Sequence, residues 1–242
     1  MDLRETAQHI DQGTHWYYQS KKIPLHQYFS ELPKNGIRNI IDIGAGTGFF
    51  SKDLFHHFPN QFHQIQCVDT GYDEPYCIEH SNSIIKYTNT LNESFDHSLV
   101  IMMDVLEHIE DEDAFLKSIL SKENGNNFFF LTVPAFQVLW SGHDDYLLHY
   151  RRYTIASLKQ VLIRNGFKID RMYYMYGSLF PLVWLRRKLF AQSKSTQHSD
   201  LKPLPDWLNL LLLKYASFEN RFARFNRLFG ITCVAEGRLS IS

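Results

Sequence analysis

The chain has 242 residues, a formal net charge of −1, and 44% hydrophobic and 21% charged residues. These values are typical of a globular protein with one sizeable core, and the near-neutral charge argues against a nucleic-acid partner. The three cysteines lack metal-like pairing, so no metal site is expected. Reduced thiols and an N-terminus without a basic, apolar leader favour a cytoplasmic location. No apolar stretch is long enough to span a bilayer.

Three regions are expected along the chain. Residues 1–36 mix aromatic, basic and amide residues and are predicted to form N-terminal lid or cap helices. Residues 37–176 alternate apolar runs with helix-compatible stretches, which is typical of βα units around a mainly parallel sheet. Residues 177–242 are predicted to form a helical insertion followed by the last strand. The expected fold is therefore α/β, with a doubly wound, mainly parallel sheet.

The predicted elements follow from runs of apolar residues bounded by polar or glycine-containing segments. Seven strands are expected, at residues 40–43, 64–68, 84–87, 99–103, 128–133, 167–174 and 231–239. Helices are expected at residues 49–57, 111–120 and 154–165, and a longer one from about residue 204 to 229.

A glycine-rich turn follows the first predicted strand, with the sequence Asp42-Ile43-Gly44-Ala45-Gly46-Thr47-Gly48. Glycines let the backbone turn sharply and let a ligand approach closely. A dinucleotide-binding G-x-G-x-x-G motif would need a third glycine at the position of Phe49. Asp69 ends the second strand, where such folds place a carboxylate that accepts two ribose hydroxyls. A cofactor loop is therefore predicted, with a purely structural turn as the alternative.

This D-x-G-x-G-x-G turn resembles the first motif of class I S-adenosylmethionine (SAM)-dependent methyltransferases. Residues 95–109, with Asp104-Val105-Leu106-Glu107-His108-Ile109 after an apolar run, resemble the fourth strand of the same family, although surface acids at a helix start are the alternative. The resemblance implies a Rossmann-like methyltransferase fold with SAM as cofactor. It also implies a set of cofactor-binding residues: Asp42, Gly44, Ala45, Gly46, Gly48, Asp69, Thr70, Asp104, Val105 and His108. In the family, Glu107 and His108 begin the next helix.

One segment departs from the family pattern. Many relatives have an acid after the third strand that contacts the adenine amino group, whereas this chain has Thr88-Asn89-Thr90. Adenine is therefore expected to contact amides or backbone groups.

Residues 134–153 form the segment in which a proton acceptor is expected. Methyl transfer to a hydroxyl or ammonium requires a positioned base, and reacting groups of doubly wound folds collect beyond the carboxyl ends of the strands. His143 and His149 lie in this segment, and a neutral imidazole is a competent base near neutral pH. We predict that His149 is the general base, with His143 as the second candidate.

The same segment resembles a bacterial methyltransferase subgroup that often occurs beside polysaccharide and lipid-linked-glycan biosynthesis. The matching positions, which we assign to the catalytic segment, are Asp144, His149, Arg151, Arg152 and Tyr153. An ion pair between Asp144 and either arginine that only pins the loop is an equally weighted alternative. The arginines are also suited to binding a carboxylate or phosphate of the substrate.

His15-Trp16-Tyr17-Tyr18, followed by Lys21-Lys22, resembles the lead-in of this subgroup, which closes over SAM. Lys22 stands where an arginine is usual. His15 and Tyr17 are therefore expected near the cofactor, because aromatic faces attract a sulfonium. A helix that simply packs its aromatics on the domain is the alternative.

The C-terminal region carries an apolar stripe at three- and four-residue spacing, interleaved with basic residues. The stripe contains Trp207, Leu211, Tyr215, Phe218, Phe222, Phe225 and Phe229. Such a helix can lie on an anionic membrane, here the inner face, but covering the domain or making a dimer contact are alternatives. The oligomeric state stays open.

The leading hypothesis is a SAM-dependent methyltransferase that acts on an oxygen or nitrogen of a small-molecule or lipid-linked acceptor. An NAD(P)-dependent oxidoreductase is the second hypothesis, and Phe49 at the third-glycine position speaks against it. A non-catalytic SAM-fold binding subunit is the third, and the intact glycine turn and Asp69 speak against it.

Overall fold

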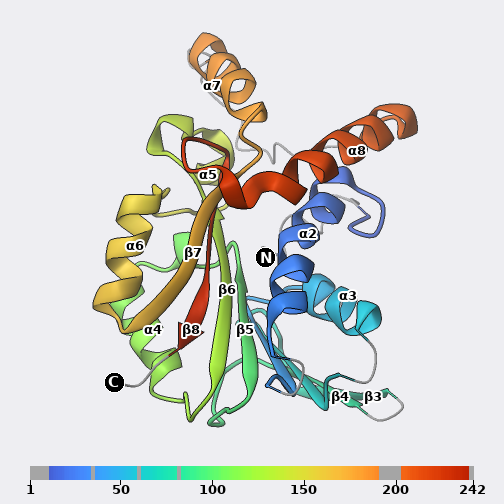
Figure 1. Ribbon diagram of the computed structural model, residues 1–242, viewed down its shortest axis with the longest axis vertical. Helices are drawn as coiled ribbons and strands as arrows, with labels where there is room; N and C mark the ends of the chain where they lie inside the picture. The colour runs from blue at the N-terminus through green and yellow to red at the C-terminus, as the bar shows by residue number, and fades with distance from the viewer. Residues whose placement is uncertain (1–10, 34–35, 59–60, 81–82, 191–202, 240–242) are drawn as a thin grey trace.

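The computed structural model describes residues 11–33, 36–58, 61–80, 83–190 and 203–239. Within these residues, a single sheet of eight strands runs through the molecule in the order β3-β4-β2-β1-β5-β6-β8-β7 (Figure 1). Helices cover both faces of this sheet, as the predicted α/β fold requires.

Five neighbouring strands are parallel, and they are the five predicted first along the chain. They are β1 (Asn39–Ile43), β2 (Gln64–Val68), β4 (Ser83–Thr88), β5 (Ser98–Met103) and β6 (Asn127–Pro134). All six residues of β5 are buried, because helices cover both faces of a parallel sheet. Parallel pairing brings the carboxyl ends of these strands to one edge, where the candidate site lies.

The prediction of seven strands is wrong, because the sheet has eight strands and is mixed. The additional strand is β3 (Tyr76–His80), which forms an antiparallel pair with β4 at one edge. Its apolar residues Tyr76 and Ile78 are about half exposed, so no burial pattern marks it in the sequence. At the other end, β8 (Thr232–Leu239) lies between β6 and β7 (Phe167–Met175) and is antiparallel to both.

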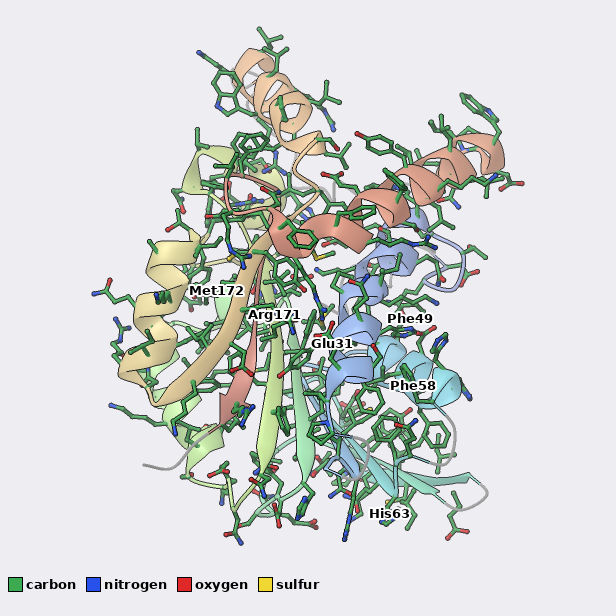
Figure 2. The ribbon with its side chains drawn as sticks, in the orientation of Figure 1. Glu31, Phe49, Phe58, His63, Arg171 and Met172 are labelled. Atoms are coloured by element: carbon green, nitrogen blue, oxygen red, sulfur yellow. The ribbon has the colours of Figure 1, made fainter. Side chains whose placement is uncertain are left out.

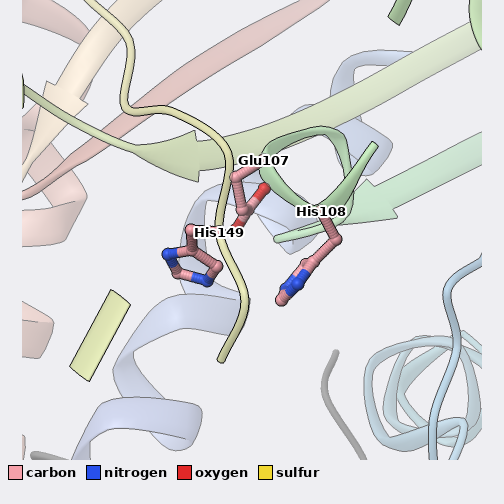
Figure 3. A group of neighbouring side chains, drawn as sticks. All are labelled: Glu107, His108 and His149. Atoms are coloured by element: carbon pink, nitrogen blue, oxygen red, sulfur yellow. The ribbon is translucent and has the colours of Figure 1, made fainter. Parts of the chain in front are cut away.

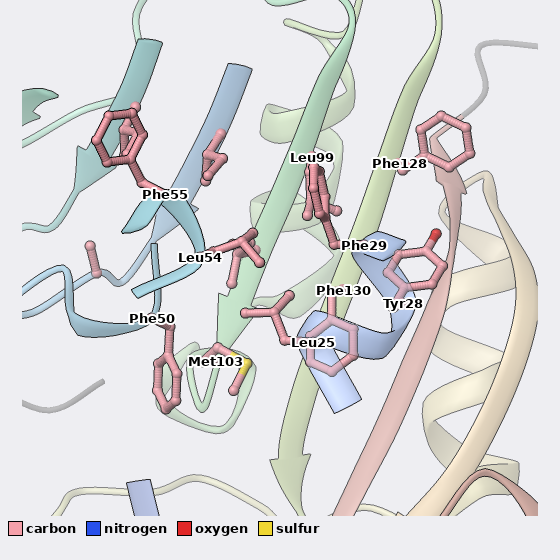
Figure 4. Close-up of a cluster of buried hydrophobic side chains, with 14 of the residues drawn as sticks. Leu25, Tyr28, Phe29, Phe50, Leu54, Phe55, Leu99, Met103, Phe128 and Phe130 are labelled. Atoms are coloured by element: carbon pink, nitrogen blue, oxygen red, sulfur yellow. The ribbon is translucent and has the colours of Figure 1, made fainter. Parts of the chain in front are cut away.

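The two sides of the sheet have separate apolar clusters, because successive strand residues face opposite sides. On one side, α2 (Trp16–Glu31) and α3 (Phe49–His57) pack over alternate residues of β5 and β6 (Figure 4). On the other side, α4 (Glu112–Leu120) and α6 (Ile155–Arg164) cover the intervening residues. Helices α3, α4 and α6 agree with the predicted ones to within one residue at each end.

Helix α2 belongs to the core rather than only to a lid. Leu25, Tyr28 and Phe29 are buried in the cluster of Figure 4. At the end of the helix, Glu31 forms an ion pair with Arg171 of β7 (Figure 2). It forms a second ion pair with Arg224. The C-terminal half of α2 is thereby fixed to the sheet, and its N-terminal half lies toward the candidate site.

Two helices follow β7 and precede β8, and they extend away from the sheet (Figure 1). They are α7 (Leu179–Phe190) and α8 (Asp206–Phe222); the short helix η3 (Ala223–Phe225) ends the second one earlier than predicted. Residues 191–202, between these two helices, lie outside the described residues. Among the described helices, none combines the length and apolar character needed to cross a membrane.

Candidate cofactor and active site

The glycine turn connects β1 to α3 in a conformation that requires glycine. Gly44, Gly46 and Gly48 have φ values of +67°, +55° and +69°, which residues with a Cβ atom rarely adopt. A Cβ on Gly44 would lie 2.5 Å from Cγ2 of Val105, so the residue after Asp104 packs directly on the turn. The predicted cofactor loop is therefore in contact with the segment that follows β5.

Asp69 lies beside this turn, at the end of β2. Its carboxylate accepts hydrogen bonds from the backbone N–H of Gly46 at 2.8 Å and of Gly71 at 2.9 Å. The hydroxyl of Tyr72 donates to the carbonyl oxygen of Gly46. Asp69 is partly exposed and Thr70 is exposed, which leaves both within reach of a ligand.

Asp42 is buried beneath the turn, with 3% of its surface exposed. Burial raises the pKa of its carboxyl group to about 6, and the neighbouring charge of Asp69 acts in the same direction. This carboxyl group supports the turn from inside, whereas Asp69 faces outward.

Asp104 holds an ion pair with Lys21 of α2, which links this helix to the end of β5. Asp104 has a positive φ of 55° and also accepts a hydrogen bond from Thr132 at 3.0 Å. Although burial opposes ionisation, the charge of Lys21 holds the pKa of Asp104 below its usual value. Lys21 also donates to the Tyr17 hydroxyl at 2.9 Å, so this aromatic ring lies at the same edge.

The contact of Lys21 with Asp104 was not predicted, whereas Lys22 was noted because it stands where an arginine is usual. Lys22 pairs instead with Asp53 of α3 at 2.7 Å. One signal was present: Lys21 lies four residues from both Tyr17 and Leu25, on the helix face that packs inward. His15 caps α2 by accepting the N–H of Tyr17 at 3.4 Å.

The segment after β6 is organised around the buried carboxylate of Asp144. This residue lies in α5 (Gly142–Tyr146), a short helix inside the predicted loop. Arg152 donates to both carboxylate oxygens, at 2.7 and 3.0 Å, and the Nδ1 atom of His149 lies 2.9 Å from Oδ1. Burial opposes ionisation, but these two partners hold the pKa of Asp144 far below its usual value. The arginine that pairs with Asp144 is therefore Arg152.

Arg151 and Tyr153 face a different partner. Both bind Glu112 at the start of α4, Arg151 at 3.0 Å and the Tyr153 hydroxyl at 2.7 Å. Tyr153 is 2% exposed. These contacts attach the segment to α4. Arg151 and Tyr153 are therefore engaged by Glu112, whereas His149 contacts Asp144.

His149 lies next to the short helix η1 (Leu106–His108) that follows β5. The ring centroids of His108 and His149 are 4.6 Å apart, while His143 is farther from His149, at 6.4 Å. Glu107 is 1% exposed, and burial together with the charge of Asp104 raises its pKa well above the usual value. The prediction that Glu107 and His108 begin a helix is wrong, because η1 is a single turn and α4 begins at Glu112.

Residues 11–171 match the family model of the methyltransferase domain. The chain belongs to this family. Its methyl donor is SAM, as predicted from the glycine turn and the second motif. The oxidoreductase hypothesis is therefore not supported. Among curated proteins, no significant match to this methyltransferase was found.

Solved structures share the fold of this methyltransferase at low sequence identity. A Bacillus halodurans protein assigned as a methyltransferase aligns over 90% of this chain and 99% of its own, with 13% identity and a TM-score of 0.52. A Haloferax volcanii protein, also assigned as a methyltransferase and solved with the activator Trm112, aligns over 95% and 91%, with 14% identity and a TM-score of 0.54. Phosphoethanolamine N-methyltransferase 2 of Haemonchus contortus aligns over 92% and 53%, with 14% identity and a TM-score of 0.51.

Proposed function

We propose that this chain transfers a methyl group from SAM to an oxygen or nitrogen of a small-molecule or lipid-linked acceptor. One observation supports this most: the glycine turn, Asp69, the Asp104–Lys21 pair and the imidazole of His149 all lie at the carboxyl-end edge of the parallel strands. This is the edge at which doubly wound folds bind ligands.

The proposed SAM site consists of three groups of residues. The glycine turn, Gly44 to Gly48, would face the amino-acid part of SAM, with the buried Asp42 supporting the turn from behind, and Asp69 with Thr70 would face the ribose hydroxyls. Asp104, Val105 and His108 would line the methionine end. SAM supplies a methyl group on a positively charged sulfur. Tyr17 lies on α2 and His15 is the N-cap of this helix, and an aromatic face here would attract that charge.

His149 is the proposed proton acceptor. Asp144 binds its Nδ1 atom, which fixes the tautomer that carries the proton there and leaves Nε2 to accept one. Arg152 keeps Asp144 ionised, while Arg151 and Tyr153 anchor the segment to α4. In this arrangement Asp144, Arg151, Arg152 and Tyr153 act as positioning residues, and His143 is the second candidate base.

Binding of the cofactor tests the proposal directly. By isothermal titration calorimetry, we expect the full chain to bind SAM and S-adenosylhomocysteine with micromolar or tighter affinity and to show no saturable binding of NAD. A protein that bound NAD instead would be an oxidoreductase on a similar fold. A protein that bound neither would be a non-catalytic relative.

A lipid-linked acceptor is favoured by the subgroup resemblance and by the exposed faces of α7 and α8. Leu182, Leu185 and Leu189 of α7 are 48–66% exposed, next to the exposed basic residues Arg186 and Lys188. On α8 and the segment after it, the exposed large apolar residues are Trp207, Leu210, Leu211, Tyr215, Phe218, Phe222, Phe225, Leu228 and Phe229. Large exposed apolar patches mark interaction sites, and basic residues among them suit an anionic membrane surface.

Vesicle sedimentation tests this membrane contact. We expect the chain to sediment with vesicles that contain phosphatidylglycerol, and the double variant Leu182→Ser, Leu185→Ser to bind at least about tenfold more weakly, because each buried apolar side chain contributes roughly 1.5–3 kcal/mol. The matched control is Ile78→Ser, Ile84→Ser, which removes two exposed apolar residues from β3 and β4. Equal sedimentation of both variants and the wild type, or none by the wild type, would count against membrane contact.

A further inference from the structure

Three side chains with metal-binding atoms meet beside the proposed SAM site. Glu107 and His108 come from η1 and His149 from the segment after α5 (Figure 3). One ligand atom of each lies within 4.8 Å of the ligand atoms of the other two. Two imidazoles and one carboxylate form the donor set that binds Zn²⁺ and related divalent transition metals.

The carboxylate of Glu107 independently indicates that this cluster binds a ligand. The residue is 1% exposed, yet its Oε2 atom has no hydrogen-bond partner among the described residues. A buried polar atom without a partner destabilises a folded protein, and such atoms are rare in native structures. A cation between Glu107 and the two imidazoles would satisfy this oxygen.

The second observation is the orientation of His149. Asp144 binds Nδ1 at 2.9 Å, and Arg152 fixes that carboxylate from the other side. Histidines that bind metals commonly donate their second ring N–H to a carboxylate in this way, which orients the ring and raises its basicity. Nε2 is then the atom left for the cluster, on the side of the ring nearer to His108 in Figure 3.

Three basic side chains around the site lie within salt-bridge distance of a carboxylate. Lys21 forms an ion pair with Asp104, and Arg152 forms one with Asp144. Arg187 lies 4.0 Å from the same Asp144 carboxylate. Lys21 therefore has a carboxylate of its own, whereas Arg152 and Arg187 share that of Asp144, so the field of these charges at Glu107 is reduced in part.

We propose that Glu107, His108 and His149 bind one divalent transition cation, whose open coordination positions receive an oxygen of the methyl acceptor. The location supports this role, because Val105, two residues before Glu107, packs on Gly44 of the cofactor turn. The inference rests on the proposed methyl transfer and narrows the acceptor to a molecule with a hydroxyl at the reacting position. With three protein ligands, such a site keeps room for water or substrate.

The cation changes how His149 acts. Its charge lowers the pKa of the acceptor hydroxyl, so the hydroxyl proton leaves to solvent water. The oxygen lone pair then forms the new C–O bond, the bond between methyl carbon and sulfur breaks, and its electron pair stays on sulfur. His149 would promote deprotonation as a ligand, whereas in a metal-free protein it would accept the proton itself.

Metal titration of the full chain, stripped with EDTA, tests the site. We expect calorimetry to show one Zn²⁺ per chain, and Mn²⁺ binding, followed by the loss of its free-ion electron paramagnetic resonance signal, to be weaker. Mg²⁺ should bind more weakly still, since it prefers oxygen ligands. Glu107→Gln and His149→Asn should each weaken Zn²⁺ binding by at least about 100-fold, because loss of an outer-sphere partner alone costs 10- to 100-fold.

His108→Asn, at a partly buried position, provides a third variant should the buried substitutions prevent folding. The matched control is His63→Asn, an exposed histidine before β2, at the far end of the sheet (Figure 2). Circular dichroism in EDTA verifies the fold of each variant. Absence of saturable Zn²⁺ binding, or equal binding by the cluster variants and the control, would overturn the cation site.

Titration of SAM into the same stripped sample separates the two proposals. If the chain binds SAM but not Zn²⁺, only the cation site is wrong, and His149 remains the proposed proton acceptor. Loss of SAM binding contradicts the proposed function itself.

Discussion

Asp69→Ala is expected to lower the affinity of the methyltransferase for SAM by at least about 100-fold. The carboxylate would accept two ribose hydroxyls, and hydrogen bonds to a charged group contribute roughly 1.5–3 kcal/mol each. It also binds the N–H groups of Gly46 and Gly71, so its loss loosens the turn that receives the ligand. Calorimetry with SAM measures the change, and Asp73→Ala, an exposed acid nearby, is the control.

Asp69→Asn separates these two contributions. The amide oxygen can still accept the N–H of Gly46, but it cannot replace a carboxylate that faces two hydroxyls. If ribose binding is the main role, the Asn variant stays at least about tenfold weaker than the wild type, in line with one lost charge-assisted hydrogen bond. If the Asn variant bound SAM as tightly as the wild type, Asp69 would only support the turn. If the Ala variant also bound SAM as tightly as the wild type, Asp69 would not belong to the SAM site.

His149→Ala is expected to lower turnover by roughly 10²- to 10⁴-fold, the contribution typical of a positioned acid–base group, while SAM affinity stays nearly unchanged. The fold should survive, because Asp144 keeps its two hydrogen bonds to Arg152 and its bond from the N–H of Ser141. His143→Ala should have a smaller effect, since that ring lies farther from the cluster.

Turnover can be followed before the acceptor is identified. Tritium-labelled SAM is incubated with the enzyme and an extract of the source cell, and the labelled product is analysed for a mass increase of one methyl group. If His149→Ala left the rate of label transfer intact, neither the base nor the metal-ligand role of His149 would hold. If the rate falls, the Zn²⁺ titrations decide between these two roles.

The strands and the glycine turn were predictable because local sequence specifies them. Apolar runs such as that of β5 are needed wherever a strand is covered on both faces, and the turn needs glycine at its three positive-φ positions. The hairpin strand β3 was missed because an exposed edge strand has no apolar run and little burial. The strand count therefore failed at the edge of the sheet and not at its centre.

Local sequence and tertiary packing each determine part of the site. The sequence by itself determined the cofactor turn, the acid after β2 and a histidine-containing segment after β6, since each is a local pattern tied to the end of a strand. Only the tertiary structure decided that Lys21 meets Asp104, that Arg152 rather than Arg151 binds Asp144, and that His149 joins Glu107 and His108. These partners are 83, 8 and about 40 residues apart in the chain. Their pairing follows from how α2 and the segment after β6 pack on the sheet, because charged groups that become buried must find partners in space.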